Sequence, residues 1–223
     1  ELGELRIGVG PWGGAVLVAP VIGRLHARHA LLRMRVVVAP WRELPARLRA
    51  RDVDVVVGSL GEIDALDEFD VLGLSAHDTV VVGRAGHPLA AAPGVTLADV
   101  FAFPLIGPGI DADAAEVLAG LAGAVADGGA AHRATTEPLT IECDSSDLLK
   151  RVLAESDALT FMPRFVVDDE LGRERLAVIT GVDLGLRVRF GAAWLRGRSL
   201  GGAGSTFLEL LRAHDEASAR PRA

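Results

Sequence analysis

The pattern of apolar and polar positions along the chain alternates between two periods. Short runs of consecutive apolar residues, typical of strands buried on both faces, are followed by stretches in which apolar residues recur every three or four positions, typical of helices. The clearest strands of the first half are LRIGVG, MRVVVAPW, DVDVVVGS and the long FDVLGLSAHDTVVVG. Strands that alternate with helices predict right-handed βαβ units and a parallel sheet.

The first helix is predicted directly after the first strand. One apolar stripe carries Val16, Leu17, Val21, Ile22 and Leu25. Pro20 is tolerated in the first turns of a helix but bends a longer one. A second helix is predicted in ELPARLRAR, which follows the second strand.

After residue 84 the same alternation starts afresh. The predicted elements are a short helix at LADVF, a strand at PLIG, a helix from about Asp113, and strand, helix and strand in LTIECDSSDLLKRVLAESDALTFMPRFVV. Either Asp144 or Ser145 can cap the middle helix of that last unit. A late strand, RVRFGAAWLR, and a terminal helix, STFLELLRAH, complete the chain. Two assemblies of similar size, joined by a long strand, predict an α/β fold of two lobes around a cleft.

The glycines after the first strand fit the spacing of a dinucleotide-binding loop. Gly8, Gly10 and Gly13 form GxGxxG in a strand-turn-helix context. That site also needs an acidic residue at the end of the second strand, about 20 residues further on. This chain has VVVAPWRE there, and the strand ends in Ala39, Pro40 and Trp41 with no acidic residue. Pro11 and Trp12 also occupy the loop, so we interpret the glycines as a turn that opens toward the cleft. Backbone N–H groups at the helix start remain available to a polar group of a smaller ligand.

Composition and charge narrow the class of protein. The chain has 223 residues, half of them apolar, and no apolar run approaches the roughly 18 residues of a membrane span. The formal net charge of −7 argues against a nucleic-acid surface in this chain by itself, because such surfaces gather Lys and Arg. The start of the chain lacks the features of a signal peptide, and Cys143 is the single cysteine. We therefore expect a cytoplasmic protein with no membrane partner.

The chain offers no persuasive catalytic or metal-binding set. His26 and His29 share a predicted helix face, but no further metal ligand is suggested near them. Cys143 precedes Asp144, whose negative charge disfavours a thiolate. We expect no catalytic residues, no metal and no cofactor, and we do not expect an enzyme.

The order of segments resembles the effector-binding domain of LysR-type transcriptional regulators over nearly the whole chain. The similar segments are GELRIGV, RVVVAPWRELPARLRARDVDVVVGS, HDTVVVGRAGHPLA, VTLADVFAFPLIGP, ALTFMPRFVVDDEL and STFLELLRA. The resemblance implies a type 2 periplasmic-binding-protein fold, in which crossover strands join two Rossmann-like lobes. Lobe I would comprise residues 1–78 and 194–223, and lobe II residues 79–193. A winged helix-turn-helix that binds promoter DNA would lie in an N-terminal domain absent from this chain.

The resemblance also implies where a small effector binds. The matching loops of lobe I contain Pro11, Trp12 and Gly13 after the first strand, and Ser59 and Leu60 after the third. The matching loops of lobe II contain Gly107 and Pro108, Asp144 and Ser145, and Thr160 and Phe161. Many relatives carry a hydroxyl residue where this chain has Trp12, which departs from the usual carboxylate-binding pattern of the family. The ring of Trp12 either contacts the ligand or fills the cleft.

The resemblance implies a sensor that relays lobe closure to DNA. A small metabolite, such as a sugar or an aromatic or other organic acid, would bind between the lobes. A homodimer or higher homo-oligomer would pass the change to the DNA-binding domains. The family pairs through helices that match residues 15–29 and 146–155, although these stripes can also cover the chain's own sheets. Two alternatives stay open: a periplasmic solute-binding protein of a transporter, and an enzyme on the same fold.

Overall fold

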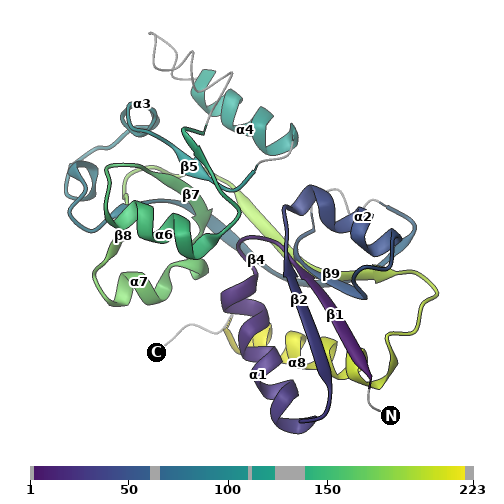
Figure 1. The fold of residues 1–223 in the computed structure, drawn as a ribbon. Helices are drawn as coiled ribbons and strands as arrows, with labels where there is room; N and C mark the ends of the chain where they lie inside the picture. The colour runs from purple at the N-terminus through teal and green to yellow at the C-terminus, as the bar shows by residue number, and fades with distance from the viewer. Residues whose placement is uncertain (1–2, 61–65, 110–111, 124–138, 219–223) are drawn as a thin grey trace. The chain divides into compact units, whose positions relative to one another are not determined.

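The computed structural model describes residues 3–60, 66–109, 112–123 and 139–218, which form two compact units (Figure 1). Unit 1 contains residues 1–77 and 187–223, and unit 2 contains residues 78–186. The long strand β4 (Phe69–Arg84) begins in unit 1 and ends in unit 2. The return into unit 1 comes at the start of β9 (Arg187–Leu195), whereas the family resemblance implies a return at residue 194.

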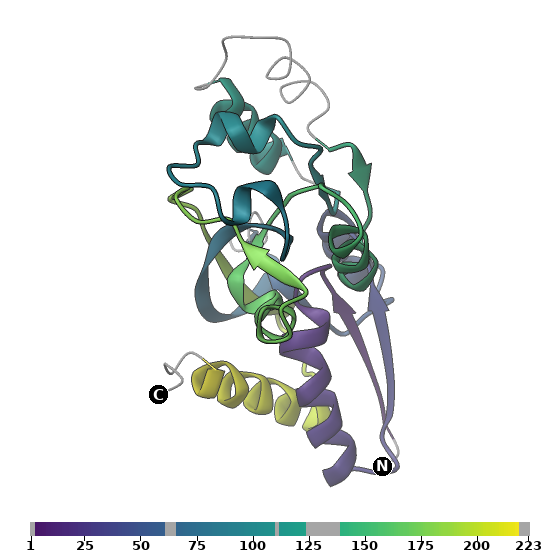
Figure 2. The same cartoon turned by 90° about the vertical axis from the view of Figure 1, so that its left-hand side faces the viewer.

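Unit 1 consists of a sheet with helices packed on it. Its elements are β1 (Glu4–Val9), the π-helix η1 (Gly14–Val18), α1 (Ala19–Arg28), β2 (Arg33–Val38), the short helix η2 (Trp41–Glu43), α2 (Leu44–Arg49), β3 (Val55–Ser59), the first part of β4, β9 and α8 (Gly201–Ser218). The strand order is β2-β1-β3-β9-β4. Helix α1 packs against α8 in both views (Figures 1 and 2).

The first predicted helix is two pieces. A π-helical turn over Gly14–Val18 precedes α1, and Pro20 lies in the first turn of α1. Proline has no N–H to donate, so the first turn is where a helix accepts it at no cost in hydrogen bonds. From the predicted stripe Leu17, Val21 and Leu25 are buried in the core of unit 1.

Unit 2 is built from the second part of β4 and shorter elements. These are the short helix η4 (Pro88–Ala90), α3 (Leu97–Phe101), β5 (Ile106–Gly107), α4 (Ala112–Gly123), β6 (Ile141–Glu142), α6 (Ser146–Ala154), β7 (Thr160–Pro163), the short helix η5 (Arg164–Val166), α7 (Asp168–Gly172) and β8 (Leu176–Val178). Strands β7 and β8 pair with β4, and β5 pairs with β6. The helix predicted at LADVF is α3, where Thr96 and Asp99 form a reciprocal capping box.

The α/β fold class is confirmed, but the sheet is mixed rather than wholly parallel. Strand β1 pairs parallel with both β2 and β3, as expected for βαβ units. Strands β3 and β9 are antiparallel, and so are β4 and its partners β7 and β8. The reason is that β9 enters unit 1 after the chain has passed through unit 2, and does not arrive by a crossover helix.

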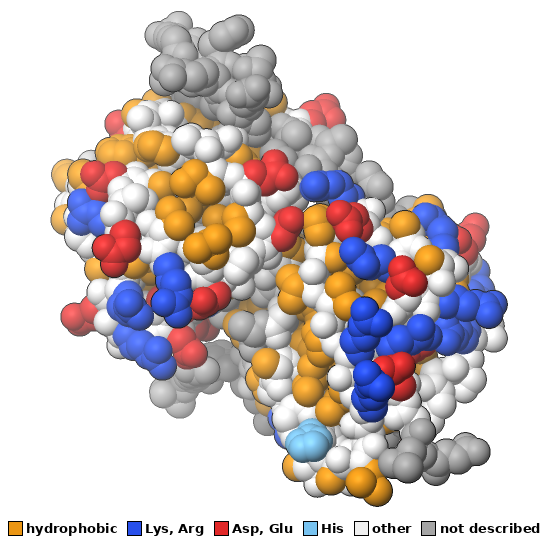
Figure 3. Space-filling view, viewed as in Figure 1, with side chains coloured by type: hydrophobic (Ala, Val, Ile, Leu, Met, Phe, Trp, Pro, Cys, Tyr) orange, Lys and Arg blue, Asp and Glu red, His pale blue; other side chains and the backbone are white. Residues whose placement is uncertain are grey.

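The two units carry opposite excess charge. Unit 1 has 16 arginines and 13 acidic residues, whereas unit 2 has 7 basic and 17 acidic residues. Arginine side chains gather along β1 and β2 in unit 1 (Figure 3). The net charge of the whole chain therefore conceals a basic and an acidic half. None of the helices in the described part of the chain combines the length and apolar character needed to cross a bilayer.

Candidate functional site

The loop after β1 and the end of β3 lie side by side in unit 1. The backbone N–H of Gly10 donates to the carbonyl of Val57 at 2.9 Å, which extends the pairing past the end of β1. The N–H of Gly13 donates to the carbonyl of Gly10 at 3.3 Å and closes a tight turn. Pro11 and Trp12 are half-buried in this turn, and Gly13 is buried.

The first glycine of the GxGxxG pattern serves close packing in this structure. A Cβ atom on Gly8 would lie 3.0 Å from both Leu44 and Val56 in the core. A Cβ atom on Gly13 would lie 3.7 Å from the carbonyl oxygen of Val57. The contacts at Gly8 are tight enough to explain the first glycine without a phosphate, whereas the distance at Gly13 is an ordinary van der Waals contact.

An aromatic ring that the sequence did not single out covers the strand ends. Trp41 belongs to η2, directly after β2, and a Cβ atom on Gly58 would lie 2.8 Å from its ring. The same ring is 3.8 Å from the position of a Cβ atom on Gly10. The indole therefore needs a glycine at position 58, whereas a Cβ atom at position 10 would make an ordinary van der Waals contact with it. The sequence shows Trp41 merely as a bulky residue in place of the acid that a dinucleotide site needs.

The other two predicted residues of unit 1 differ in exposure. Ser59 ends β3 and is half-buried. Leu60 is only 2% exposed, and its side chain packs over Gly191 of β9, where an added Cβ atom would meet it at 2.6 Å. Its N–H donates to the carbonyl of Arg189 at 2.9 Å. Leu60 thus contributes to the core of unit 1.

The three predicted loops of unit 2 come together. Gly107 ends β5, where its carbonyl accepts a hydrogen bond from the N–H of Cys143 at 2.8 Å. The Asp144 carboxylate accepts a hydrogen bond from the N–H of Gly109 at 3.2 Å, which ties the two loops together. Pro108 lies between them and is half-buried.

Ser145 is the residue that caps α6. Its hydroxyl accepts a hydrogen bond from the N–H of Leu148 at 3.3 Å, the usual N-cap geometry. The choice left open between Asp144 and Ser145 is therefore decided by position. Asp144 is one residue too early for the cap and binds the neighbouring loop instead.

Thr160 contributes a buried hydroxyl to the same part of unit 2. The residue is 1% exposed, and its Oγ1 has no hydrogen-bond partner among the described residues. That oxygen lies 3.8 Å from the position of a Cβ atom on Gly107. Phe161 follows, half-buried, with its ring centroid 6.2 Å from that of Phe101. A buried hydroxyl without a partner is uncommon, because its desolvation is uncompensated.

The structure therefore assembles each predicted loop set within its own unit. The set of unit 1 lies at the ends of β1 and β3, and that of unit 2 around β5, β6 and β7. No group of three His, Cys, Asp or Glu side chains in the described ranges is arranged to hold a metal ion.

The comparison with known families decides what kind of domain this is. Residues 1–216 match the model of the LysR substrate binding domain. The chain belongs to the LysR family of transcriptional regulators. It is 33% identical over 217 residues to the SDS degradation transcriptional activation protein of a Pseudomonas species, covering 96% of this chain and 67% of that protein.

Solved structures of LysR regulators share the fold. The regulatory domain of MetR from Neisseria meningitidis superposes with a TM-score of 0.69 at 18% identity, covering 96% of this chain and 94% of that one. Full-length OxyR from Pseudomonas aeruginosa gives a TM-score of 0.71 at 16% identity, covering 94% and 69%. The chain spans 64% of an OxyR chain from Corynebacterium glutamicum.

This LysR chain thus has the two-lobed, periplasmic-binding-protein-like fold of regulatory domains, as the resemblance implied. It is an effector-binding regulatory domain, and its relatives are transcriptional regulators. Neither alternative, a solute-binding protein of a transporter or an enzyme, receives support from these matches.

Proposed function

We propose that this domain binds a small organic metabolite through both loop sets. The loops at Pro11 to Gly13 and at Ser59 would contact it from unit 1, and those at Gly107, Asp144 and Thr160 from unit 2. In the full-length protein a winged helix-turn-helix domain would bind promoter DNA in the cytoplasm. Binding changes the arrangement of the units only as far as the effector has different affinity for the two arrangements.

One observation carries the assignment of the site. The Thr160 hydroxyl is buried, lies beside the Gly107 loop and has no partner in the described residues. A bound ligand that offers a donor or an acceptor would compensate the desolvation of this group. The hydroxyl therefore supports a polar effector, such as a sugar or an organic acid, better than a hydrocarbon.

The experiment is a melting screen of the chain against sugars, aromatic acids, other organic acids and alkyl sulfates. Alkyl sulfates are included because a relative is named for SDS degradation. A ligand that binds only the folded state raises the melting temperature by mass action. Nicotinamide nucleotides serve as the control for the glycine pattern, and a shift with these alone would overturn our interpretation of it.

The variant Thr160→Val separates binding from folding. Valine matches threonine in shape and removes the unpartnered hydroxyl, so we expect the free domain to be as stable as before or more stable by about 1 kcal/mol. We expect the effector-induced shift in melting temperature to be lost. If the shift persists unchanged, Thr160 does not contact the effector and the unit 2 site is wrong.

We also propose that two copies of the domain pair, with unit 1 of each facing unit 2 of the other. Part of each predicted apolar stripe packs inside its own unit and cannot contact a second copy. These buried residues are Val21 and Leu25 in unit 1, and Leu149 and Leu153 in unit 2. What stays exposed is Leu148 on α6, at 50%.

The edge strand β2 adds a second unpartnered apolar surface in unit 1. Val36 and Val38, on one face of this strand, are 43% and 57% exposed. An unpaired edge with exposed valines is a ready site for association. Unit 1 has an excess of basic residues and unit 2 an excess of acidic residues. Charge complementarity therefore favours pairing unit 1 of one copy with unit 2 of the other over pairing two identical units.

Light scattering after gel filtration tests the pairing. We expect a dimer for the unmodified chain, and a monomer or a weaker dimer for Leu148→Lys. The matched control is Val117→Lys on α4, which is 40% exposed but lies outside both surfaces. A dimer that resists Leu148→Lys and Val38→Lys alike would contradict the proposed surfaces.

A further inference from the structure

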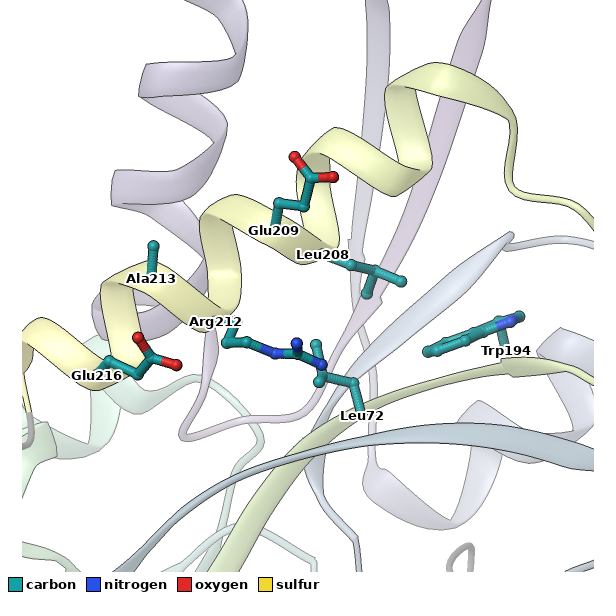
Figure 4. A pocket seen from close by; sticks show the side chains of 7 residues that line it. All are labelled: Leu72, Trp194, Leu208, Glu209, Arg212, Ala213 and Glu216. Atoms are coloured by element: carbon teal, nitrogen blue, oxygen red, sulfur yellow. The ribbon is translucent and has the colours of Figure 1, made fainter.

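Unit 1 contains a hollow that neither loop set uses. It lies between α8 and the strands β4 and β9, and has a volume of about 270 Å³ (Figure 4). The lining residues are Leu72 of β4, Trp194 of β9, and Leu208, Glu209, Arg212, Ala213 and Glu216 of α8. Pockets for drug-sized ligands commonly span about 300–1,000 Å³, so a hollow just below that range suits a smaller molecule. We call it the α8 groove.

The floor of the α8 groove is apolar. Leu72 is 8% exposed, and the half-buried indole of Trp194 and the side chain of Leu208 lie beside it. An aromatic ring next to aliphatic side chains buries the apolar part of a ligand at little cost in side-chain entropy. This floor therefore favours a short alkyl chain or a ring.

The wall of the α8 groove carries one guanidinium group. Arg212 extends from α8 over the floor toward Leu72 (Figure 4). In the described part of the chain its side chain forms no ion pair or hydrogen bond, although Glu209 and Glu216 lie three and four positions away on the same helix. In Figure 4 the Glu209 carboxylate points away from Leu72 and Trp194. The guanidinium is thus available to a ligand.

We propose that the α8 groove binds an amphipathic monoanion, whose carboxylate pairs with Arg212 while its apolar part covers Leu72 and Trp194. A guanidinium offers two parallel N–H donors to a carboxylate, which makes such pairs strong and geometrically specific. The excess of arginines in unit 1, 16 against 13 acidic residues, adds a favourable field for an anion. The two glutamates on the rim disfavour a second negative charge on the ligand.

The groove is distinct from the proposed effector site, because its residues come from β4, β9 and α8 and from none of the predicted loops. A ligand there would stabilise the packing of α8 on the sheet of unit 1. The domain would then respond to two ligands: an effector at the loops and an amphipathic anion in the groove.

The test uses three ligands with the same eight-carbon chain: octanoate, octan-1-ol and octylammonium. Each is titrated into the ¹⁵N-labelled chain, and the three indole N–H signals are followed by NMR. The chain has three tryptophans, and a Trp→Phe variant at each position assigns the signals. We expect saturable shifts of the Trp194 signal with octanoate, and binding of the alcohol and the ammonium that is about tenfold weaker or more.

The variant Arg212→Gln removes the charge and keeps a long polar side chain. We expect it to weaken octanoate binding about tenfold and to leave octan-1-ol binding unchanged. The matched control is Arg24→Gln, an exposed arginine on α1 of the same unit, which should change neither affinity.

Three results would overturn the proposal. The first is a Trp194 signal that does not move on addition of octanoate. If the Trp12 signal moves instead, octanoate binds at the loops, and the proposed function stands without the groove. The second is equal affinity for octanoate and octan-1-ol, which would make the groove purely apolar. The third is tighter binding of octylammonium, which would assign the head-group contact to the glutamates.

Discussion

Asp54 joins three separate parts of unit 1 and carries the sharpest stability prediction. Its carboxylate accepts hydrogen bonds from the backbone N–H of Arg6 at 2.9 Å, from Arg6 Nε at 3.2 Å and from Arg6 Nη2 at 2.8 Å. Arg198, which precedes α8, donates a further bond at 2.8 Å. The Asp54 side chain is 11% exposed, against 28% for Arg6 and 32% for Arg198.

The perturbation is Asp54→Asn, which keeps the shape and removes the charge. The amide of asparagine presents one acceptor oxygen, so donors now aimed at the second carboxylate oxygen lose their partner. Hydrogen bonds to charged groups contribute about 1.5–3 kcal/mol each when buried. Because both arginines are partly exposed, water replaces some of what is lost. We therefore expect unit 1 to be destabilised by about 2–3 kcal/mol at pH 7.

The pH dependence has a definite sign. Burial raises the pKa of the Asp54 carboxyl. The hydrogen bonds and charge of Arg6, together with the charge of Arg198, lower this pKa by more than burial raises it, so the pKa lies below its ordinary value. A lowered pKa contributes stability that is complete above the ordinary value, about 3.9, and is lost as the pH falls through the folded-state pKa. The destabilisation by Asp54→Asn should be constant between about pH 5 and 8 and should shrink below about pH 4.

The assay is urea unfolding followed by tryptophan fluorescence. Trp12, Trp41 and Trp194 all lie in unit 1, and the chain has no tyrosine, so this signal reports the unit that contains Asp54. The control is Asp52→Asn, at an exposed position in the same loop, which should change stability by less than about 0.5 kcal/mol. A loss no larger than that of the control, or a loss that grows as the pH falls from 5 to 3, would refute the reasoning.

Two further substitutions test the packing of the loop sets. Gly58→Ala places a Cβ atom 2.8 Å from the Trp41 ring. It should lower the free energy of unfolding by about 1–3 kcal/mol in the same fluorescence assay. The control is Gly73→Ala, where nothing lies within 4 Å, and it should lower the free energy of unfolding by less than about 1 kcal/mol. Equal effects would mean that the indole moves freely. Ser145→Ala removes the cap of α6 and should destabilise unit 2 by about 1 kcal/mol in urea unfolding followed by circular dichroism. Ser145→Asp should keep most of that stability. Equal stabilities of the alanine variant and the unmodified chain would show that the cap contributes nothing.

The order of elements was predictable from the sequence because it depends on local patterns. The strand and helix periods located β1, β3, β4 and α8, and the long run at Phe69–Arg84 correctly predicted a strand passing between two units. Short-range rules also applied at the loops. A serine or aspartate before an amphipathic stretch predicts a cap, and Ser145 is that cap.

The local pattern did not determine strand direction or the contacts between distant residues, and the prediction of a parallel sheet was wrong for β9 and for the partners of β4. Whether β9 runs parallel or antiparallel to β3 depends on where the chain returns from unit 2, and no residue within β9 encodes that path. The need for a glycine at position 58 likewise depends on Trp41, whose ring contacts β3 only in the folded sheet.

The sequence by itself determined the alternation of strands and helices, the two-unit organisation and, through the order of its segments, the LysR family. Tertiary structure alone brought Asp54 to Arg198, which are 144 positions apart, and Leu72 to Trp194 and Arg212. The physical reason is that periodicity and capping act within a few residues of the backbone, whereas ion pairs and grooves form between side chains that only the packing of distant elements brings into contact.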